Sequence, residues 1–284
     1  MKKTILFLLI SLGIYSCSSV PITGRKQLSL VSDSEILTLS LQQYDEFIKT
    51  APKSTDQAKT ALVMKVGRNI AAAVETYYKA AGAESMLSGY AWEFNLIKDA
   101  QVNAFCMPGG KIVVYEGILP YTQTEGGLAV VLGHEVAHAI AKHANERVSQ
   151  QMVAQYGSAI LGSAIGGTSA ATQEMVGAAY GIGAQYGVLM PFSRKQELEA
   201  DHLGLIFMAI AGYDPNEAIP FWQRMSQQGG ATPEFMSTHP SDDTRIKKIS
   251  SEYLPSALQY YKGGSSSGKT SPNSNTKTSK DWSY

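Results

Sequence analysis

The sequence has little cysteine, no net charge and no long apolar run. Only 2 of its 284 residues are cysteine, too few for the disulfide framework of small secreted proteins. Because 24 Lys and Arg balance 24 Asp and Glu, the chain lacks the basic surface on which nucleic-acid binders depend. A hydrophobic fraction of 44% against 17% charged residues excludes wholesale disorder and provides the core of one large domain or two small ones.

The amino terminus indicates export from the cytoplasm. Lys2 and Lys3 precede an apolar run over residues 5–15, which is shorter than the roughly 20 residues that a membrane-spanning helix needs. The run ends in Ile14-Tyr15-Ser16-Cys17, which resembles the lipobox of bacterial lipoproteins. We therefore expect residues 1–16 to be a signal peptide and Cys17 to be lipidated, with ordinary secretion and nearby cleavage as the alternative.

This processing predicts a location in the bacterial cell envelope. Ser18 and Ser19 resemble the sorting context of outer-membrane lipoproteins, so we expect an anchor in the outer membrane and a domain facing the periplasm. If Cys17 carries acyl chains, Cys106 has no disulfide partner within the chain. Cys106 is then better explained as a small buried hydrophobic residue than as a nucleophile.

The rest of the chain reads as one α+β domain that is mainly helical. Residues 17–31 lack helical periodicity and are expected to form a tether, the domain spans residues 32–262, and the Gly/Ser/Thr/Lys/Asn-rich tail over residues 263–284 is expected to be disordered. Apolar periodicity and capping residues predict helices, and β-branched runs predict strands. The predicted helices cover residues 32–49, 57–80, 124–151, 194–211, 214 onward with a kink at Pro220, and 241–253, and the strands cover 92–97 and 111–115.

Residues 152–191 are rich in Gly, Ala and Ser, with Glu174 as the only formal charge. One interpretation is a small-residue helical hairpin packed into the fold, since the apolar residues never reach a membrane-spanning length. The other interpretation is a lid over an active site, because glycine lowers the cost of rearrangement.

The strongest chemical signal is His134-Glu135-Val136-Ala137-His138, an H-E-x-x-H arrangement. Positions four apart on a helix return to the same face, so both imidazoles can hold one tetrahedral zinc ion. Glu135 is close enough in the helical projection to reach a water on the metal without binding the metal itself. A helix whose histidines are satisfied by ordinary hydrogen bonds is the alternative. His143 falls on the opposite side of this helix and is expected to be a surface histidine.

A catalytic zinc needs a third protein ligand, and three carboxylates follow about sixty residues later. Glu197 and Asp201 are four residues apart on one helix face, whereas Glu199 is turned away from them. The spacing alone does not choose the ligand, and a charged helix start would explain the same residues.

These motifs together resemble the zinc metallopeptidases typified by HtpX and the CAAX prenyl proteases, especially periplasmic lipoprotein members such as BepA and LoiP. The resemblance covers about residues 20–255 and includes the H-E-x-x-H helix, Glu197-x-x-Ala200-Asp201, and His239-Pro240 with Arg245. It implies a gluzincin-like zincin domain with a small β-sheet and one Zn²⁺ per chain. It also implies Glu197 as the third ligand and Asp201 as the group that orients a ligand histidine.

The resemblance also suggests roles for His239 and Arg245. A His-Pro near the carboxyl end can occupy the water position as an off switch, and a nearby arginine can neutralise the oxyanion of the reaction. The alternative for His239 is a cap of the turn before the helix at Ser241.

The run Lys111-Ile112-Val113-Val114-Tyr115 is a candidate substrate-binding strand. An exposed sheet edge beside the zinc helix would let an unfolded peptide add as a further strand, with backbone pairing that tolerates many sequences. An interior strand that serves only the core is the alternative.

The sequence thus predicts a zinc-dependent endopeptidase of the cell envelope in which Glu135 is the general base. Zinc would lower the pKa of its water toward about 7, and Glu135 would take the proton and pass it to the leaving amine. The expected substrates are misfolded or misassembled outer-membrane proteins, as in quality control. A membrane-tethered chaperone or assembly factor with a structural or latent zinc is the rival interpretation. The sequence does not indicate the oligomeric state.

Overall fold

The structure, a computed structural model, describes residues 17–20, 23–156, 192–227, 234–239 and 243–262. The predicted signal peptide over residues 1–16, most of the small-residue stretch over 152–191 and the tail over 263–284 lie outside these residues. Within them, the expected architecture of many helices with a small sheet is confirmed. None of the described helices is both long and apolar enough to cross a membrane.

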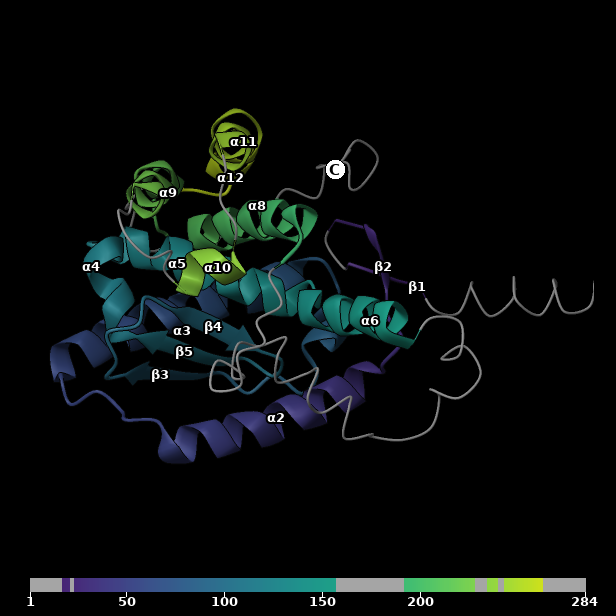
Figure 1. Cartoon of the computed structure of the whole chain (residues 1–284). Coiled ribbons are helices and arrows are strands. Elements are labelled where there is room, and N and C mark those ends of the chain that lie inside the picture. The colour runs from purple at the N-terminus through teal and green to yellow at the C-terminus, as the bar shows by residue number, and fades with distance from the viewer. Residues whose placement is uncertain (1–16, 21–22, 157–191, 228–233, 240–242, 263–284) are drawn as a thin grey trace, which may run out of the picture.

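Helices lie on both sides of a central three-stranded sheet (Figure 1). The strands are β1 (Cys17–Ser19), β2 (Lys26–Leu28), β3 (Glu93–Ile97), β4 (Ala104–Met107) and β5 (Lys111–Tyr115). The α-helices are α2 (Asp33–Thr50), α3 (Gln57–Ala80), α4 (Leu119–Thr122), α5 (Glu125–Ile140), α6 (His143–Tyr156), α8 (Arg194–Ile210), α9 (Ala218–Ser226), α10 (Glu234–Thr238), α11 (Asp243–Lys248) and α12 (Leu254–Leu258). Short turns of 3₁₀-helix are η1 (Glu84–Leu87), η2 (Glu116–Ile118) and η5 (Pro215–Glu217), and a π-helical turn, η6 (Ile249–Tyr253), joins α11 to α12.

Side-chain caps fix the starts of the long helices. Ser32, Asp56 and Thr124 each accept a hydrogen bond from a backbone N–H in the first turn of α2, α3 and α5. At the start of α8, Ser193 and Gln196 form a reciprocal capping box. The helices predicted over residues 32–49, 57–80 and 194–211 are therefore confirmed to within about two residues.

The sheet corrects the prediction that Lys111–Tyr115 is an exposed edge. The strand order is β3-β5-β4, so β5 is central, parallel to β3 and antiparallel to β4. Ile112 and Val114 belong to a core cluster shared with α3, α5 and α8, whereas Val113 and Tyr115 belong to a second cluster shared with α2 and α6. A continuous apolar run is typical of such a strand, which is buried on both faces.

Strand β4, one of the two edge strands of this sheet, was not predicted. The turn at Gly109 and Gly110, whose φ angles are 82° and 79°, folds β4 back along β5. Only glycine adopts this left-handed conformation without strain. Of the three strands, β4 lies against α5, the helix that carries the H-E-x-x-H residues.

The helix predicted over residues 124–151 is interrupted, so this prediction is wrong in its middle. α5 ends at Ile140, and Lys142 has a φ of 58°, which is uncommon for a residue with a side chain. The Lys142 ammonium lies 2.5 Å from a carboxylate oxygen of Asp33, which ties this turn to α2. α6 then starts at His143.

The amino-terminal segment differs from the expected tether because it is ordered against the domain. β1 and β2 pair in an antiparallel manner, with Cys17 opposite Leu28. Between the strands, Arg25 forms ion pairs with Glu146 of α6 and Glu199 of α8. The chain therefore contacts the helical core soon after Cys17.

Two glycines bring α5 and α8 unusually close. A Cβ atom added at Gly133 would lie 2.7 Å from the carbonyl oxygen of Gly204, and one added at Gly204 would lie 2.7 Å from the backbone nitrogen of His134. Real Cβ atoms essentially never come this close to backbone atoms. The small residues therefore set the distance between the helix that carries His134 and the helix that carries Glu197.

We predict that Gly204→Ala lowers the free energy of unfolding by about 1–3 kcal/mol, because the added methyl group must force the two backbones apart. Chemical denaturation followed by circular dichroism measures this loss. Ala72→Leu adds a larger side chain at an exposed position of α3 and serves as the control, with a change within about 0.5 kcal/mol. An equal stability of the two variants would contradict the close approach.

Candidate active site

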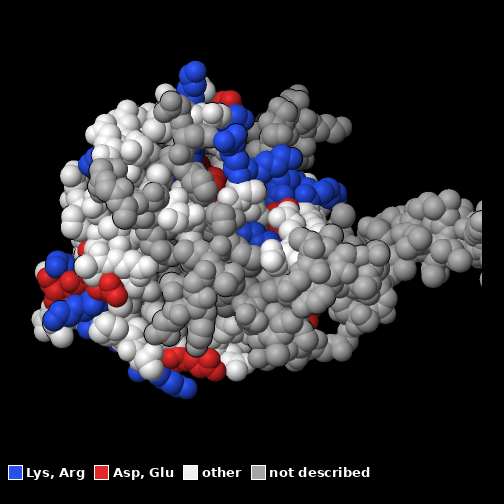
Figure 2. Space-filling model, in the orientation of Figure 1, with Lys and Arg blue, Asp and Glu red and all other residues white. Residues whose placement is uncertain are grey.

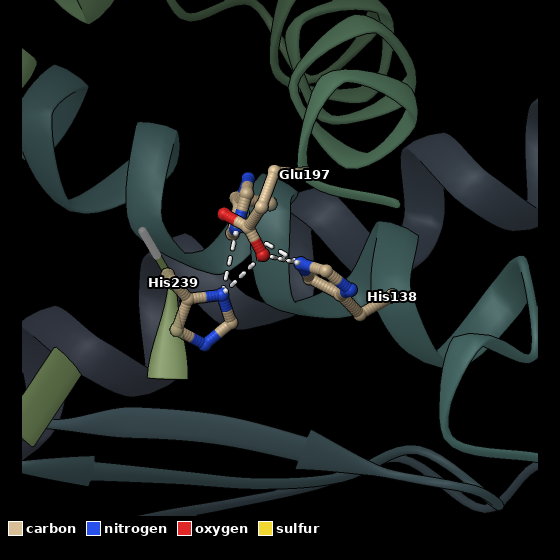
Figure 3. Close-up of side chains that lie close together, drawn as sticks. His138, Glu197 and His239 are labelled. Atoms are coloured by element: carbon tan, nitrogen blue, oxygen red, sulfur yellow. Dashed lines mark hydrogen bonds and ion pairs between the residues drawn. The ribbon is translucent and has the colours of Figure 1, made fainter. Parts of the chain in front are cut away.

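The two histidines and the glutamate of the H-E-x-x-H motif lie in the interior. The histidines are about one helical turn apart on α5, and the glutamate directly follows the first of them. His134, Glu135 and His138 have relative exposures of only 1%, 2% and 3%. α8 places Glu197 beside them, and the end of α10 places His239 there, both also buried. Figure 3 shows His138, Glu197 and His239 pointing toward one another above the strands of the sheet.

Four potential metal-ligand atoms converge on one point. His138 Nε2 lies 3.0 Å from His134 Nε2 and 3.3 Å from Glu197 Oε1. His239 Nδ1 lies 3.2 Å from His134 Nε2 and 3.1 Å from Glu197 Oε1. Among the described residues, these four side chains form the cluster that could hold a metal ion, with all ligand atoms within 4.8 Å of one another.

These separations fit a tetrahedral zinc ion. Zinc binds nitrogen and oxygen ligands at about 2.0–2.1 Å, which places neighbouring ligand atoms of a tetrahedron about 3.3 Å apart. The distance from His134 Nε2 to Glu197 Oε2, 3.5 Å, falls in the same range. Imidazole and carboxylate donors are also the ligand types that zinc accepts. The expected ligands His134, His138 and Glu197 are thus brought together, and His239 stands at a fourth corner.

A second layer of buried groups holds His134 in place. Asp201 Oδ1 lies 3.0 Å from His134 Nδ1, the ring nitrogen that faces away from the other ligands. Arg245 donates to Asp201 through Nε at 2.5 Å and contacts Glu197 through Nη1 at 2.7 Å. The Arg245 guanidinium also lies 3.7 Å from the centre of the Trp222 ring, a cation–π contact. Asp201 therefore lies next to His134, one of the expected ligands.

The same contacts determine the charges of the site. Burial alone would raise the pKa values of Glu197 and Asp201, but Arg245 holds both below their ordinary values. Burial and Arg245 oppose protonation of His134, yet the hydrogen bonds of Asp201 and Glu197 raise its pKa to about 9. Burial lowers the pKa of His138 well below its ordinary value, so this ring is neutral. A metal must therefore displace a proton from His134 but none from His138.

Glu135 is buried beside the ligand cluster rather than within it. Burial raises the pKa of its carboxyl group, which makes it a better proton acceptor. Its Oε1 lies 3.4 Å from His239 Nε2, so the imidazole stands between Glu135 and the ligand atoms on its other side. A water in place of this imidazole would lie within reach of the Glu135 carboxylate.

His143 corrects another prediction, since it is fully buried and not a surface residue. The break at Lys142 separates it from the helical register of α5 and places its ring next to His138, with ring centroids 4.9 Å apart. Glu199 is turned away from Glu197 and Asp201, as predicted, and its carboxylate lies 2.9 Å from His143 Nε2.

Three further neighbours of the site were not recognised in the sequence. Phe192 covers His138 with ring centroids 3.8 Å apart, and it also contacts His239. Trp222 and Phe235 line His134 from the other side. Aromatic residues in helices or loops carry no spacing signal that separates a site wall from ordinary core. Cys106 is a buried residue of β4, as expected, and burial raises the pKa of its thiol.

A family model, Peptidase family M48, matches residues 66–253, more than half of the chain. The matched region contains all of the motif residues on α5 and α8, together with His239 and Arg245.

Two groups of characterised relatives are similar to the chain. It is 43% identical over 178 residues to the mitochondrial metalloendopeptidase OMA1 of Schizosaccharomyces pombe, covering 62% of this chain and 50% of that protein. It is 31% identical over 251 residues to OMA1 of Saccharomyces cerevisiae, covering 85% of this chain and 70% of that protein. The β-barrel assembly-enhancing protease of Yersinia pestis is 32% identical over 161 residues, covering 55% of this chain and 33% of that protein. The chain thus spans about half the length of several of these relatives.

We predict that Arg245→Leu lowers the free energy of unfolding of the metal-free chain by about 3–5 kcal/mol, because two buried carboxylates lose their countercharge. Denaturant titration at neutral pH measures the loss. Lys248→Gln, on the same helix, removes only a partly exposed pair with Glu252 and should cost less than about 1 kcal/mol.

The loss of unfolding free energy in Arg245→Leu should become smaller in acid. Glu197 and Asp201 have lowered pKa values in the folded wild-type chain, so the stability that they contribute is present above their unfolded pKa values. It is lost as the pH falls through their folded values. A deficit that is small at neutral pH, or that grows in acid, would contradict the assigned ion pairs.

Proposed function

Since the chain belongs to peptidase family M48, we propose that it is a zinc-dependent endopeptidase in which His134, His138 and Glu197 hold the metal and Glu135 is the general base. The observation that carries the proposal is the buried cluster of four ligand atoms, all within 4.8 Å of one another, with the buried Glu135 carboxylate beside it. The relatives named as metalloendopeptidases and as a protease support the same reaction class.

The metal ion and Glu135 would have separate roles in peptide hydrolysis. When bound, zinc would polarise the scissile carbonyl and lower the pKa of a water molecule. Glu135 accepts the proton of the attacking water and delivers it to the leaving amine nitrogen. Its burial favours this role, because its raised pKa moves the carboxyl group closer to the operating pH.

Arg245 is better suited to positioning than to direct stabilisation of an oxyanion. Its guanidinium is engaged with Glu197 and Asp201 and lies against Trp222. The carboxylate of Glu197 is held in a fixed orientation toward the histidines as a result. Neutralisation of an oxyanion by Arg245 would require the guanidinium to leave these partners.

His239 gives the site a closed form. A catalytic zinc site keeps one position open for water, whereas a site with four protein ligands is typical of structural zinc. His239 occupies the fourth corner here, and its backbone N–H donates to the carbonyl of Phe235 at 2.9 Å. We propose that His239 must leave this corner before hydrolysis can occur, so that the chain rests in a latent form.

The same four-ligand arrangement favours the rival function, a chaperone or assembly factor with a structural zinc. Glu135 separates the two interpretations, since a structural site has no need of a buried carboxylate whose pKa is raised by burial. Proteolysis of an unfolded protein such as casein, blocked by a chelator and restored by zinc, is the experiment that decides between them.

We propose that unfolded segments of envelope proteins bind along β4 rather than along Lys111–Tyr115. The backbone of β5 is already paired on both sides, whereas β4 is an edge strand and lies against α5. All four residues of β4 are buried, so a substrate segment can pair with this strand only after the edge is uncovered. Pairing through the backbone recognises many sequences, which suits substrates that are misfolded or misassembled. The name of the β-barrel assembly-enhancing relatives supports substrates of the bacterial outer membrane, while the OMA1 relatives are mitochondrial.

A lipid anchor at Cys17 would hold this site close to a membrane. Cys17 is the first residue of β1, and Arg25, directly before β2, pairs with Glu146 of α6 and Glu199 of α8. Figure 2 shows Lys and Arg side chains gathered near the side where Figure 1 places β1 and β2. Basic residues next to an acyl anchor add to membrane binding where the lipids are anionic. We therefore propose an outer-membrane lipoprotein that faces the periplasm.

We predict that Glu135→Gln keeps zinc but lowers the rate of casein cleavage by about 10²–10⁴-fold, because the general base is lost while the ligands remain. Peptide release and metal content of the same sample measure the two effects. Glu125→Gln changes an exposed glutamate of the same helix and should retain full activity. Cleavage by Glu135→Gln at the wild-type rate would refute the assigned base.

We predict that His239→Ala raises basal proteolysis, because the fourth corner becomes available to water. If the open form is about 10% populated in the wild type, the gain approaches tenfold. The double variant that combines His239→Ala with Glu135→Gln should be inactive, which tests whether the added turnover comes from this site. An unchanged or lower rate for His239→Ala would contradict the switch.

A further inference from the structure

His138 has its own buried support, separate from the one that holds His134. His138 Nδ1, the nitrogen that faces away from the ligand cluster, lies 2.8 Å from His143 Nδ1. The other nitrogen of His143, Nε2, lies 2.9 Å from Glu199 Oε2. His143 and Glu199 both have a relative exposure of 0%, so water does not compete for these contacts.

The protons of this chain of contacts can be arranged in one way that leaves His138 able to bind a metal. If His143 Nδ1 donated to His138 Nδ1, the proton of neutral His138 would sit on Nε2 and block its lone pair. The arrangement compatible with a metal has His138 Nδ1–H donating to His143 Nδ1. His143 then carries its proton on Nε2 and donates it to the Glu199 carboxylate. By accepting this proton, the Glu199 carboxylate selects the correct tautomer of both rings.

The amino-terminal segment holds Glu199 in this role. Arg25 Nε donates to Glu199 Oε2 at 2.6 Å, and the Thr23 hydroxyl donates to Glu199 Oε1. With His143, three donors therefore surround the two oxygens of this carboxylate. The carboxylate thus remains an acceptor because residues far away in the sequence surround it with donors.

Arg25 is itself fixed by a two-point ion pair. Its Nη1 and Nη2 donate to the two carboxylate oxygens of Glu146 at 2.9 and 2.8 Å. Gln196 of α8 donates to the same Glu146 carboxylate at 2.9 Å and to the backbone carbonyl of His143 at 3.2 Å. The segment, the start of α6 and the start of α8 therefore form one connected network.

We propose that Thr23 and Arg25 position the metal ligand His138 through Glu199 and His143, so that the amino-terminal segment is part of the metal centre and more than a tether. The proposal rests on the proposed function in one respect, that zinc binds at His134, His138 and Glu197. Each histidine ligand then has a carboxylate behind it: Asp201 acts directly on His134, and Glu199 acts on His138 through a second imidazole. These residues do not touch substrate and are positioning residues.

The test measures zinc affinity of the purified full chain by competition with a chromophoric chelator, and the visible absorption spectrum of the Co²⁺-substituted chain. His143→Phe keeps a ring of similar size but removes the acceptor, and Glu199→Gln removes the carboxylate charge. Arg25 is separated from His138 by three successive contacts, through Glu199 and His143, and touches no ligand. Lys26→Gln, an exposed neighbour of Arg25 on the same segment, is the matched control.

We expect His143→Phe and Glu199→Gln to weaken zinc binding about 10–100-fold and Arg25→Gln to weaken it less, with an altered Co²⁺ spectrum in each. Arg25→Lys should recover part of the loss, and Lys26→Gln should match the wild type. If His143→Phe does not fold, Arg25→Gln decides the question. Wild-type affinity and an unchanged spectrum in folded Glu199→Gln and Arg25→Gln would overturn the proposal. A wild-type chain that binds no zinc would instead overturn the proposed function.

Discussion

The structure depends on the close contact between α5 and α8 at Gly133 and Gly204. α5 carries His134 and His138, and α8 carries Glu197, Glu199 and Asp201, so the separation of these two helices sets the distances between the histidines of α5 and the carboxylates of α8. Neither position tolerates even a methyl group without movement of the backbone. The close approach of the two helices, and with it the geometry of the charged site, therefore depends on two glycines.

Burial of so many charged groups would be unfavourable without mutual compensation. Glu197, Asp201 and Arg245 lie together with three histidine rings in a region that water does not reach, and each carboxylate remains ionised because Arg245 lies beside it. Bound zinc would add further positive charge next to Glu197 and would replace the proton of His134. Metal binding and folding are therefore coupled, and the loss of either charge partner weakens both.

The parts of this arrangement that were predictable from sequence are those with a local pattern. Helical spacing identified His134, Glu135 and His138, capping residues located the start of α2, and the resemblance to a family singled out Glu197 and Asp201. The position of His143 was not predictable, because it depends on the left-handed backbone conformation of Lys142. Glycine is the usual sequence signal for that conformation, and here the residue is a lysine. β5 was misplaced at an edge because periodicity does not reveal strand order, and the role of Arg25 depends on contacts with residues more than 120 positions away. The assignments of Glu135 as base and of His239 as switch stay predictions.

The central claim is that one zinc ion is held by His134, His138 and Glu197. Extended X-ray absorption fine structure at the zinc edge, measured on the purified chain, tests it most directly. The account predicts one zinc per chain with nitrogen and oxygen ligands at about 2.0–2.1 Å, imidazole scattering that diminishes in His138→Ala, and no sulfur ligand. A zinc ion ligated by sulfur, or a zinc spectrum that is unchanged in His138→Ala, would contradict the account.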